Sequence, residues 1–263
     1  MKKSSVFFKL IIPNYNNEKW LNKCLTSISE QTFKNFKAII VDDMSTDKSI
    51  EIIETYKGKF DFELIKLKEK KYNGGARNVA IKKKVPSEYT LFLDSDDWFY
   101  KPTTLENLHN YLVEHPVDCL SLPYHCVYQN MEQDYFWKNS RNDIKTLVWD
   151  QCGACWTKCI KTKLIQLFPE GTLMEDTVQH IKQCNYLKTL DTYNVPVVSY
   201  NRTNTESLTH PLTKQSIKWK ASIFRFIADL MELWCSNGDC EARRQERLAT
   251  AKKEIKEGKY GVF

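Results

Sequence analysis

The chain has 263 residues, of which 42% are hydrophobic and 13% aromatic, and its formal net charge is +6. This length suits one large α/β domain, with or without a helical tail, and the composition excludes an intrinsically disordered chain. Eight glycines and eight prolines are too few for a collagen-like or linker-rich protein. The mildly basic balance suits an acidic partner, although a lysine-rich surface explains it more simply.

No secretory signal peptide is recognisable at the N-terminus, because the apolar run 6–12 is short and ends at Pro13. The same run is too short to span a bilayer. The nine scattered cysteines are then interpreted as reduced thiols. We therefore expect a cytoplasmic protein, with the inner face of the membrane as an alternative location.

The first hundred residues alternate between apolar strands and amphipathic helices. Ser45, Thr46 and Asp47 are expected to cap the helix that follows the second strand. Repeated strand–helix units predict a mostly parallel sheet with helices on both faces. The expected strands are 6–12, 36–41, 62–67 and 89–93, and the expected helices are 18–31, 45–56, one that begins at Gly74 and Gly75, and one at 103–114.

The second half of the chain is less regular. Strands are expected within 118–138 and at 195–200, and a short helix at 173–184. An amphipathic helix at 213–236 and a charged helix at 239–256 are expected to follow. Since no internal repeat or clean domain boundary is visible, we expect one globule with a helical C-terminal annex.

Acidic side chains gather where the predicted strands end, and ligands of open α/β sheets bind outside the carboxyl ends of strands. Asp42 and Asp43 follow the second strand, and the segment 94–97, Asp-Ser-Asp-Asp, follows the fourth. Neighbouring carboxylates repel one another, and a divalent cation that favours oxygen ligands, Mn²⁺ or Mg²⁺, would offset the repulsion. A polar turn that caps the next helix is the alternative, since this spacing is short and common.

Arg77 lies just after Gly74 and Gly75, near a predicted helix start. Backbone N–H groups at such a position, together with a guanidinium, suit a diphosphate. A surface arginine is the simpler alternative. The residues alone thus predict an α/β protein with a metal and phosphate site at strand ends, and they name no reaction.

Short motifs follow one another in order over the first 210 residues. They are LIIPNYN at 10–16, LTSISEQT at 25–32, IVDDMSTD at 40–47, GARN at 75–78, FLDSDD at 92–97, EG at 170–171, MEDT at 174–177, YNR at 200–202 and SLT at 207–209. Together they resemble the glycosyltransferases of family 2 over roughly residues 6–210. Several ordered motifs are far more specific than any one of them.

The resemblance implies the GT-A fold, a Rossmann-like mixed sheet that is mostly parallel and flanked by helices. It implies a glycosyltransferase domain at 1–212, with a nucleotide-sugar-binding half at 1–100 and an acceptor-binding half at 101–212, before a helical extension at 213–263. It also implies transfer with inversion from a nucleotide-sugar, most readily a UDP-sugar, to a hydroxyl of a bacterial-type surface glycan or lipid-linked saccharide.

Matching positions of the family's motifs imply where the nucleobase binds. Pro13 and Tyr15 would border the base, and Asp43 would accept a hydrogen bond from it, with Asp42 beside it. The family usually has glycine after the acidic pair, where this chain has Met44. A side chain at this position is expected to alter the turn beside the base.

The same resemblance implies the diphosphate and metal site. Arg77 would lie near the ribose or diphosphate, and Asp94 by the ribose and the metal. Ser95 would belong to the same nucleotide-sugar site. Asp96 would ligate Mn²⁺ or Mg²⁺ directly, with Asp97 as an alternate ligand.

The second half of the resemblance implies the catalytic and acceptor residues. Asp176 would be the general base, with Glu175 adjacent to it. Trp156 lies in a segment that would line the acceptor pocket. Arg202 and His210 would come from a loop that closes over the diphosphate, with His210 also near the metal.

Other partners are compatible with the same residues. A phage-type enzyme that glycosylates a modified DNA base is one alternative, given the basic balance and seven tryptophans. A non-catalytic nucleotide-binding protein is another, which the full set of acidic motifs disfavours. The amphipathic stretch 217–234 could contact a membrane surface, although packing against the protein body is the simpler interpretation.

Overall fold

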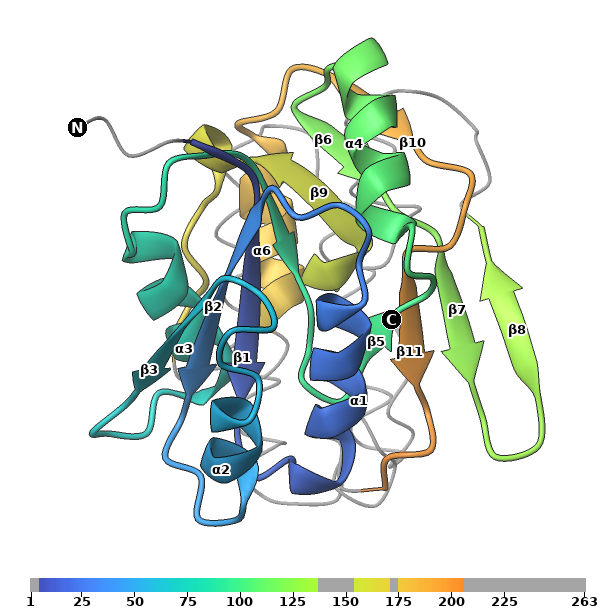
Figure 1. The fold of residues 1–263 in the computed structure, drawn as a ribbon. Helices are drawn as coiled ribbons and strands as arrows, with labels where there is room; N and C mark the ends of the chain where they lie inside the picture. The colour runs from blue at the N-terminus through green and yellow to red at the C-terminus, as the bar shows by residue number, and fades with distance from the viewer. Residues whose placement is uncertain (1–4, 137–153, 171–174, 206–263) are drawn as a thin grey trace, which may run out of the picture.

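The computed structural model describes residues 5–136, 154–170 and 175–205. A seven-stranded sheet, in the order β10-β6-β9-β4-β1-β2-β3, forms the centre, and a four-stranded sheet, β5-β11-β7-β8, lies beside it (Figure 1). The strands are β1 (Val6–Asn14), β2 (Phe36–Asp42), β3 (Phe62–Lys66), β4 (Ser87–Phe92), β5 (Trp98–Phe99), β6 (Cys119–Ser121), β7 (Tyr124–Val127), β8 (Glu132–Tyr135), β9 (Lys158–Lys161), β10 (Leu190–Thr192) and β11 (Val198–Asn201). The helices are α1 (Glu18–Ser29), α2 (Ser49–Glu54), α3 (Tyr72–Lys82), α4 (Thr104–Glu114) and α6 (Glu175–Cys184), with the short 3-10 helices η1 (Cys155–Thr157) and η2 (Thr162–Leu164).

The strand–helix repeats of the N-terminal half form the parallel part of the large sheet, as the sequence predicts. β1 pairs in parallel with β2 and β4, and β2 pairs in parallel with β3. The sequence did not predict β9, which runs antiparallel between β4 and β6. This strand makes the sheet mixed and joins the two halves of the chain through backbone hydrogen bonds.

Helices cover both faces of the large sheet. Figure 1 shows α1 and α2 in front of the sheet and α6 behind it. α3 packs against β1, β2 and α6. α3 and the first turn of α6 therefore meet on one face of the sheet, where Arg77 of α3 contacts Glu175 of α6.

The central strand β1 is buried along most of its length and contains a lysine. Lys9 is 2% exposed, and its ammonium donates to the carbonyl oxygens of Ile81 and Lys83, at 3.2 and 2.9 Å. Burial lowers the pKa of Lys9 to about 8. A cation at the carboxyl end of a helix is stabilised by the helix dipole, so Lys9 fixes the end of α3 against the sheet.

The start of α2 differs from the sequence prediction. The helix begins at Ser49, and the Asp47 carboxylate accepts the Ser49 N–H at 3.0 Å. Ser45 was expected to help cap this helix, but its hydroxyl donates to Asp42. The competing hydrogen bond to a buried carboxylate explains the later start, because charged acceptors bind more strongly than neutral ones.

Some predicted segments lie outside the described residues. These are the helices at 213–236 and 239–256 and the amphipathic stretch 217–234. Within the described part of the chain, no helix has the length and apolar character needed to cross a membrane.

Candidate active site

The first acidic pair lies at the carboxyl end of β2, beside the end of β1. Asn14 is the register partner of Asp42, and its amide donates to Asp42 Oδ1 at 2.8 Å. The Ser45 N–H and hydroxyl also donate to this carboxylate, at 3.0 and 2.6 Å. Asp42 is 2% exposed, so it holds two strand ends together and presents no free carboxylate to a nucleotide.

Asp43 joins the end of β2 to the start of α3. Its carboxylate accepts the backbone N–H groups of Lys71 and Tyr72, at 2.7 and 2.8 Å. The Lys70 ammonium lies 3.3 Å from Asp43 Oδ2 and over the ring of Tyr15. The predicted base-binding residues Asp43 and Tyr15 are therefore neighbours, connected through Lys70.

Three residues in or next to the first acidic turn have a left-handed backbone. Asn16, Met44 and Tyr72 have φ angles of 46°, 67° and 58°, and they are the non-glycine residues with positive φ in the described ranges. Tyr15, Met44 and Tyr72 are all exposed, whereas Pro13 on β1 is buried. Because glycine adopts positive φ without strain, this conformation explains the family's preference for glycine at the position of Met44.

The second acidic turn follows β4 and is held by two of its own side chains. Ser95 and Asp97 are both buried. The Ser95 hydroxyl accepts a hydrogen bond from the Asn17 amide at 2.9 Å, and Asp97 Oδ1 accepts a backbone N–H at the end of β11 at 2.8 Å. These two residues fix the turn, which leaves Asp94 and Asp96 as its partly exposed carboxylates.

The carboxyl groups of this turn disfavour one another's ionisation. Burial raises the pKa of Asp96 to about 6, repulsion from Asp94 adds to the shift, and a 2.8 Å hydrogen bond from Asn204 opposes it. Burial also raises the pKa of Asp97, as does repulsion from both neighbouring carboxylates. A divalent cation would remove this penalty, so the turn fits one.

The turn after β4 offers a cation two partly exposed carboxylates. No group of three or more histidine, cysteine, aspartate and glutamate side chains in the described ranges could hold a metal ion. Mg²⁺-type ions are commonly held by one or two carboxylates together with substrate phosphates. Asp96 and Asp94 fit that two-carboxylate arrangement. His210, the third predicted metal residue, lies outside the described residues.

Arg77 lies between acidic residues from the two halves of the chain. Its side chain is 2% exposed, and its two terminal nitrogens donate to Asp94 Oδ1 at 2.5 Å and to Glu175 Oε1 at 2.6 Å. The Arg77 Nε is buried without a hydrogen-bond partner among the described residues. Arg77 was expected near the ribose or diphosphate, and the structure shows that two carboxylates enclose its guanidinium.

Glu175 and Asp176 form the first turn of α6. Burial raises the pKa of both carboxyls, while attraction to Arg77 lowers it. Repulsion from Asp94 further raises the pKa of Asp176, and Asp176 Oδ1 accepts the N–H of Thr177 at 2.9 Å. Because Glu175 is committed to its ion pair with Arg77, Asp176 is better placed to accept a proton.

The predicted acceptor residue Trp156 lies in η1 and is only 5% exposed. Its ring packs against those of Tyr124 and Tyr200, with centroids 5.1 and 4.9 Å away. Arg202 donates to the Tyr200 hydroxyl at 3.0 Å. Trp156 thus supports two partly exposed tyrosines, and these tyrosines offer more surface to an acceptor than Trp156 does.

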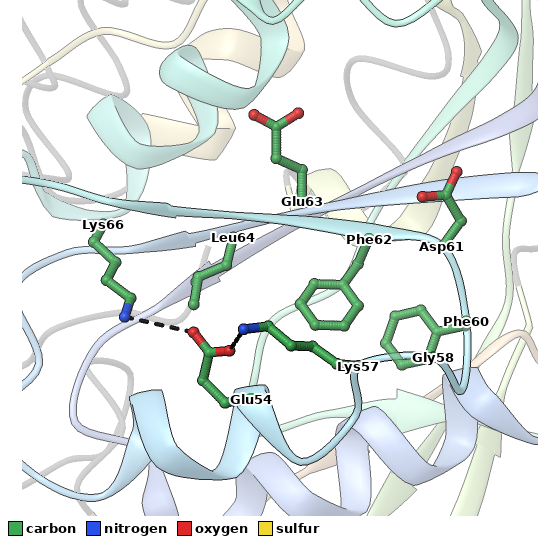
Figure 2. Close-up of a pocket in the computed structure, with 9 residues that line it drawn as sticks. All are labelled: Glu54, Lys57, Gly58, Phe60, Asp61, Phe62, Glu63, Leu64 and Lys66. Atoms are coloured by element: carbon green, nitrogen blue, oxygen red, sulfur yellow. Dashed lines mark ion pairs between the residues drawn. The ribbon is translucent and has the colours of Figure 1, made fainter.

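A surface hollow of about 440 Å³ lies elsewhere, between α2 and the edge strand β3 (Figure 2). None of the residues that line it belongs to the predicted site. Figure 2 shows the Glu54 carboxylate between the ammonium groups of Lys57 and Lys66, with Phe60, Phe62 and Leu64 beside them.

Sequence reasoning assigned no role to the amides that hold the acidic segments. Asn14 binds Asp42, and Asn204 binds Asp96. Asn78 exchanges hydrogen bonds with the backbone of Phe168, at 2.9 and 2.8 Å. Asn14 and Asn78 stand inside the recognised motifs, which could have identified them, whereas Asn204 gives no local signal.

The fold, with its mixed central sheet, is shared with solved GT-A glycosyltransferases. The crystal structure of S. aureus TarS 1–349 in complex with UDP-GlcNAc superposes with a TM-score of 0.71 at 22% identity, covering 86% of this chain and 66% of that chain. The mannosyltransferase PcManGT from Pyrobaculum calidifontis, in complex with GDP-Man and Mn²⁺, gives 0.62 at 16% identity, covering 87% and 65%. These similarities establish the GT-A fold.

The family follows from the sequence comparison. The model described as Glycosyl transferase family 2 matches residues 9–189, and the chain belongs to that family. The poly(ribitol-phosphate) β-N-acetylglucosaminyltransferase TarS of Staphylococcus aureus is 37% identical over 116 residues, which are 43% of this chain and 20% of the relative. The glycosyltransferase GlyA of Streptococcus pneumoniae is 28% identical over 234 residues, with 77% of this chain and 32% of the relative covered. The chain thus spans about a fifth to a third of these relatives' lengths.

Proposed function

We propose that the protein is an inverting glycosyltransferase that moves a sugar from a UDP-sugar to a hydroxyl of a cell-surface glycan. One observation supports this most directly. Arg77 brings the acidic turn after β4 into contact with the acidic start of α6, through ion pairs of 2.5 and 2.6 Å. A donor-side carboxylate pair and a candidate base therefore lie on either side of one guanidinium.

The chemistry follows from this arrangement. Asp176 takes the proton of the acceptor hydroxyl while the hydroxyl oxygen attacks the anomeric carbon. The bond from that carbon to the diphosphate oxygen breaks, and a single displacement inverts the configuration. Asp96 and Asp94 would hold Mn²⁺ or Mg²⁺, whose positive charge stabilises the departing diphosphate.

The raised pKa of Asp176 supports its role as the base. A carboxylate that binds a proton more readily than an ordinary aspartate is a better acceptor near neutral pH. Burial is the main cause of the shift, and the Asp94 carboxylate adds to it. The acidic turn after β4 thus helps to raise the pKa of the proposed base, Asp176.

The relatives support the choice of donor and acceptor. One matched crystal structure contains UDP-GlcNAc, and several matched proteins are named as poly(ribitol-phosphate) glycosyltransferases. We therefore propose a UDP-sugar as donor and a hydroxyl of a polyol-phosphate or saccharide polymer as acceptor.

The direct test is a panel of UDP-, GDP-, CDP- and dTDP-sugars, each with and without Mn²⁺. Bound donor stabilises the folded state by mass action, so the melting temperature should rise for UDP-sugars when Mn²⁺ is present. Slow donor hydrolysis, with water as the acceptor, should follow the same preference. A panel in which no nucleotide-sugar is bound or hydrolysed would contradict the proposal.

A further inference from the structure

One face of α3 contacts the segment that leads into the candidate base. Gly74, Arg77 and Asn78 are spaced three and four residues apart, so they share one side of the helix. Arg77 binds Glu175, and Asn78 binds the backbone of Phe168 through both atoms of its amide. We call these three residues the α3 face.

Gly74 shows how closely the two segments approach. A Cβ atom at this position would lie 2.7 Å from the carbonyl oxygen of Pro169 and 2.9 Å from Cγ of Glu175. Cβ atoms do not approach backbone oxygen atoms this closely. Any larger residue at position 74 would therefore push Pro169 and Glu175 away from α3. The contact through Gly74 does not depend on charge. Like the ion pair between Arg77 and Glu175, it joins α3 to the start of α6.

Stability alone does not explain the ion pairs of Arg77, because buried ion pairs contribute little net stability. Burying the Arg77 guanidinium and the Glu175 carboxylate carries a desolvation cost, which their attraction offsets only with good geometry. The Arg77 Nε lies buried without a partner among the described residues, so the arrangement is not fully satisfied. Such groups are better explained by a need to fix the relative positions of Asp94 and Glu175.

We infer that the α3 face positions the catalytic base, and that Arg77 is a positioning residue and not a ligand of the donor diphosphate. This inference rests on the proposed function. Asp94 stands at the donor side, and Glu175 is covalently linked to Asp176. Holding both carboxylates on one guanidinium fixes the distance from base to leaving group, on which a single displacement depends.

The test uses Gly74→Ala. This substitution should displace Glu175 and the adjacent Asp176, and it removes no charge. The full chain is assayed with UDP and UDP-GlcNAc, or with the panel member that the wild type hydrolyses fastest. We expect UDP affinity and the KM for donor to stay within about threefold, while kcat for hydrolysis falls about 100-fold, as a misplacement near 1 Å can cause.

Arg77→Met is the second variant, and Lys83→Met is its matched control. Lys83 belongs to an exposed ion pair with Glu63, just beyond the end of α3. Arg77→Met should lower kcat about as far as Gly74→Ala, with UDP affinity kept, and the double variant should lose little more, since both act on one contact. Lys83→Met should keep the wild-type kcat.

Three results would overturn the inference. They are a wild-type kcat in a folded Gly74→Ala variant, a loss of UDP affinity of about tenfold or more in Arg77→Met, or fully additive losses in the double variant. If Gly74→Ala does not fold by circular dichroism, Asn78→Ala tests the same face and carries the same expectation. A wild type that binds no nucleotide would overturn the proposed function itself, which distinguishes the two failures.

Discussion

Two acidic turns follow β2 and β4, the strands on either side of β1, and they differ in how many hydrogen bonds their carboxylates accept. Asp42 accepts three hydrogen bonds from Asn14 and Ser45 and is buried. Asp96, in the turn after β4, accepts one from Asn204, and burial and Asp94 raise its pKa to about 6. The Asp42 carboxylate is satisfied by hydrogen bonds within its own part of the fold. The Asp96 carboxylate has fewer donors, so a bound cation could stabilise its negative charge.

The difference shows that similar acidic pairs in a sequence can have opposite consequences for stability. A carboxylate that accepts several hydrogen bonds stabilises the fold, and its removal lowers the free energy of unfolding. A carboxylate that is buried beside another carboxylate destabilises the fold when it ionises. An aspartate-to-asparagine substitution in each turn should therefore distinguish an acid that stabilises the fold from one that supports turnover.

The largest expected effect is on turnover, from Asp96→Asn. Donor hydrolysis in the presence of Mn²⁺ should fall by about 100-fold or more, because the proposed metal site loses one of its two carboxylates. Stability above about pH 6 should stay equal or rise. The raised pKa means that the folded state holds this proton more tightly than the unfolded state, so the wild type loses stability as pH rises from about 4 through about 6.

The control for this variant is Asp61→Asn, which changes a carboxylate that is exposed and paired with Lys37. It should alter neither turnover nor the melting temperature appreciably. Asp96→Asn with wild-type hydrolysis would remove Asp96 from the proposed metal site.

Asp42→Asn should have the opposite effect. The variant loses charge-assisted hydrogen bonds to Asn14 and Ser45, so the free energy of unfolding should fall by about 2–4 kcal/mol. Urea denaturation at pH 7 measures the loss. Unchanged stability, together with weaker UDP binding, would show that Asp42 contacts the nucleotide directly.

The pH dependence of hydrolysis tests the setting of Asp176. The base works only when deprotonated, so kcat should fall as pH drops through its pKa, and burial places that pKa above the usual range of aspartate. Arg77→Met should move this acid limb to higher pH, because Arg77 lowers the pKa of Asp176. A rate that stays flat down to about pH 4 would contradict this setting.

The smallest expected effect comes from Met44→Gly in the first turn. Met44 has a φ of 67°, which costs a residue with a Cβ about 1 kcal/mol or more relative to glycine. The variant should therefore be more stable by about 0.5–1 kcal/mol in urea denaturation. Met44→Ala, which keeps the Cβ, should show no such gain.

Much of the N-terminal half could be predicted from sequence, because its signals are local. Apolar strands and the polar residues that end them gave the parallel sheet and the meeting of Asp43 with Tyr15. The family resemblance gave the GT-A fold. Most predicted strands and helices of this half were confirmed within a few residues.

What sequence reasoning missed depends on contacts between distant segments. Arg77 meets Glu175 across 98 positions of the chain, and no local pattern shows that a guanidinium near a helix start will be buried. The segment of Trp156 was expected to line the acceptor pocket, and no local signal showed that its ring would be buried against Tyr124 and Tyr200. Asn204 reaches Asp96 from a loop without a motif.

The central claim is that Asp176 is the base of a site whose donor is held by the N-terminal half. Asp176→Asn tests it most directly, with UDP affinity measured by calorimetry and UDP-GlcNAc hydrolysis measured in parallel. The account predicts wild-type affinity for UDP and a loss of turnover of about 100- to 10,000-fold. Wild-type turnover in this variant would contradict it.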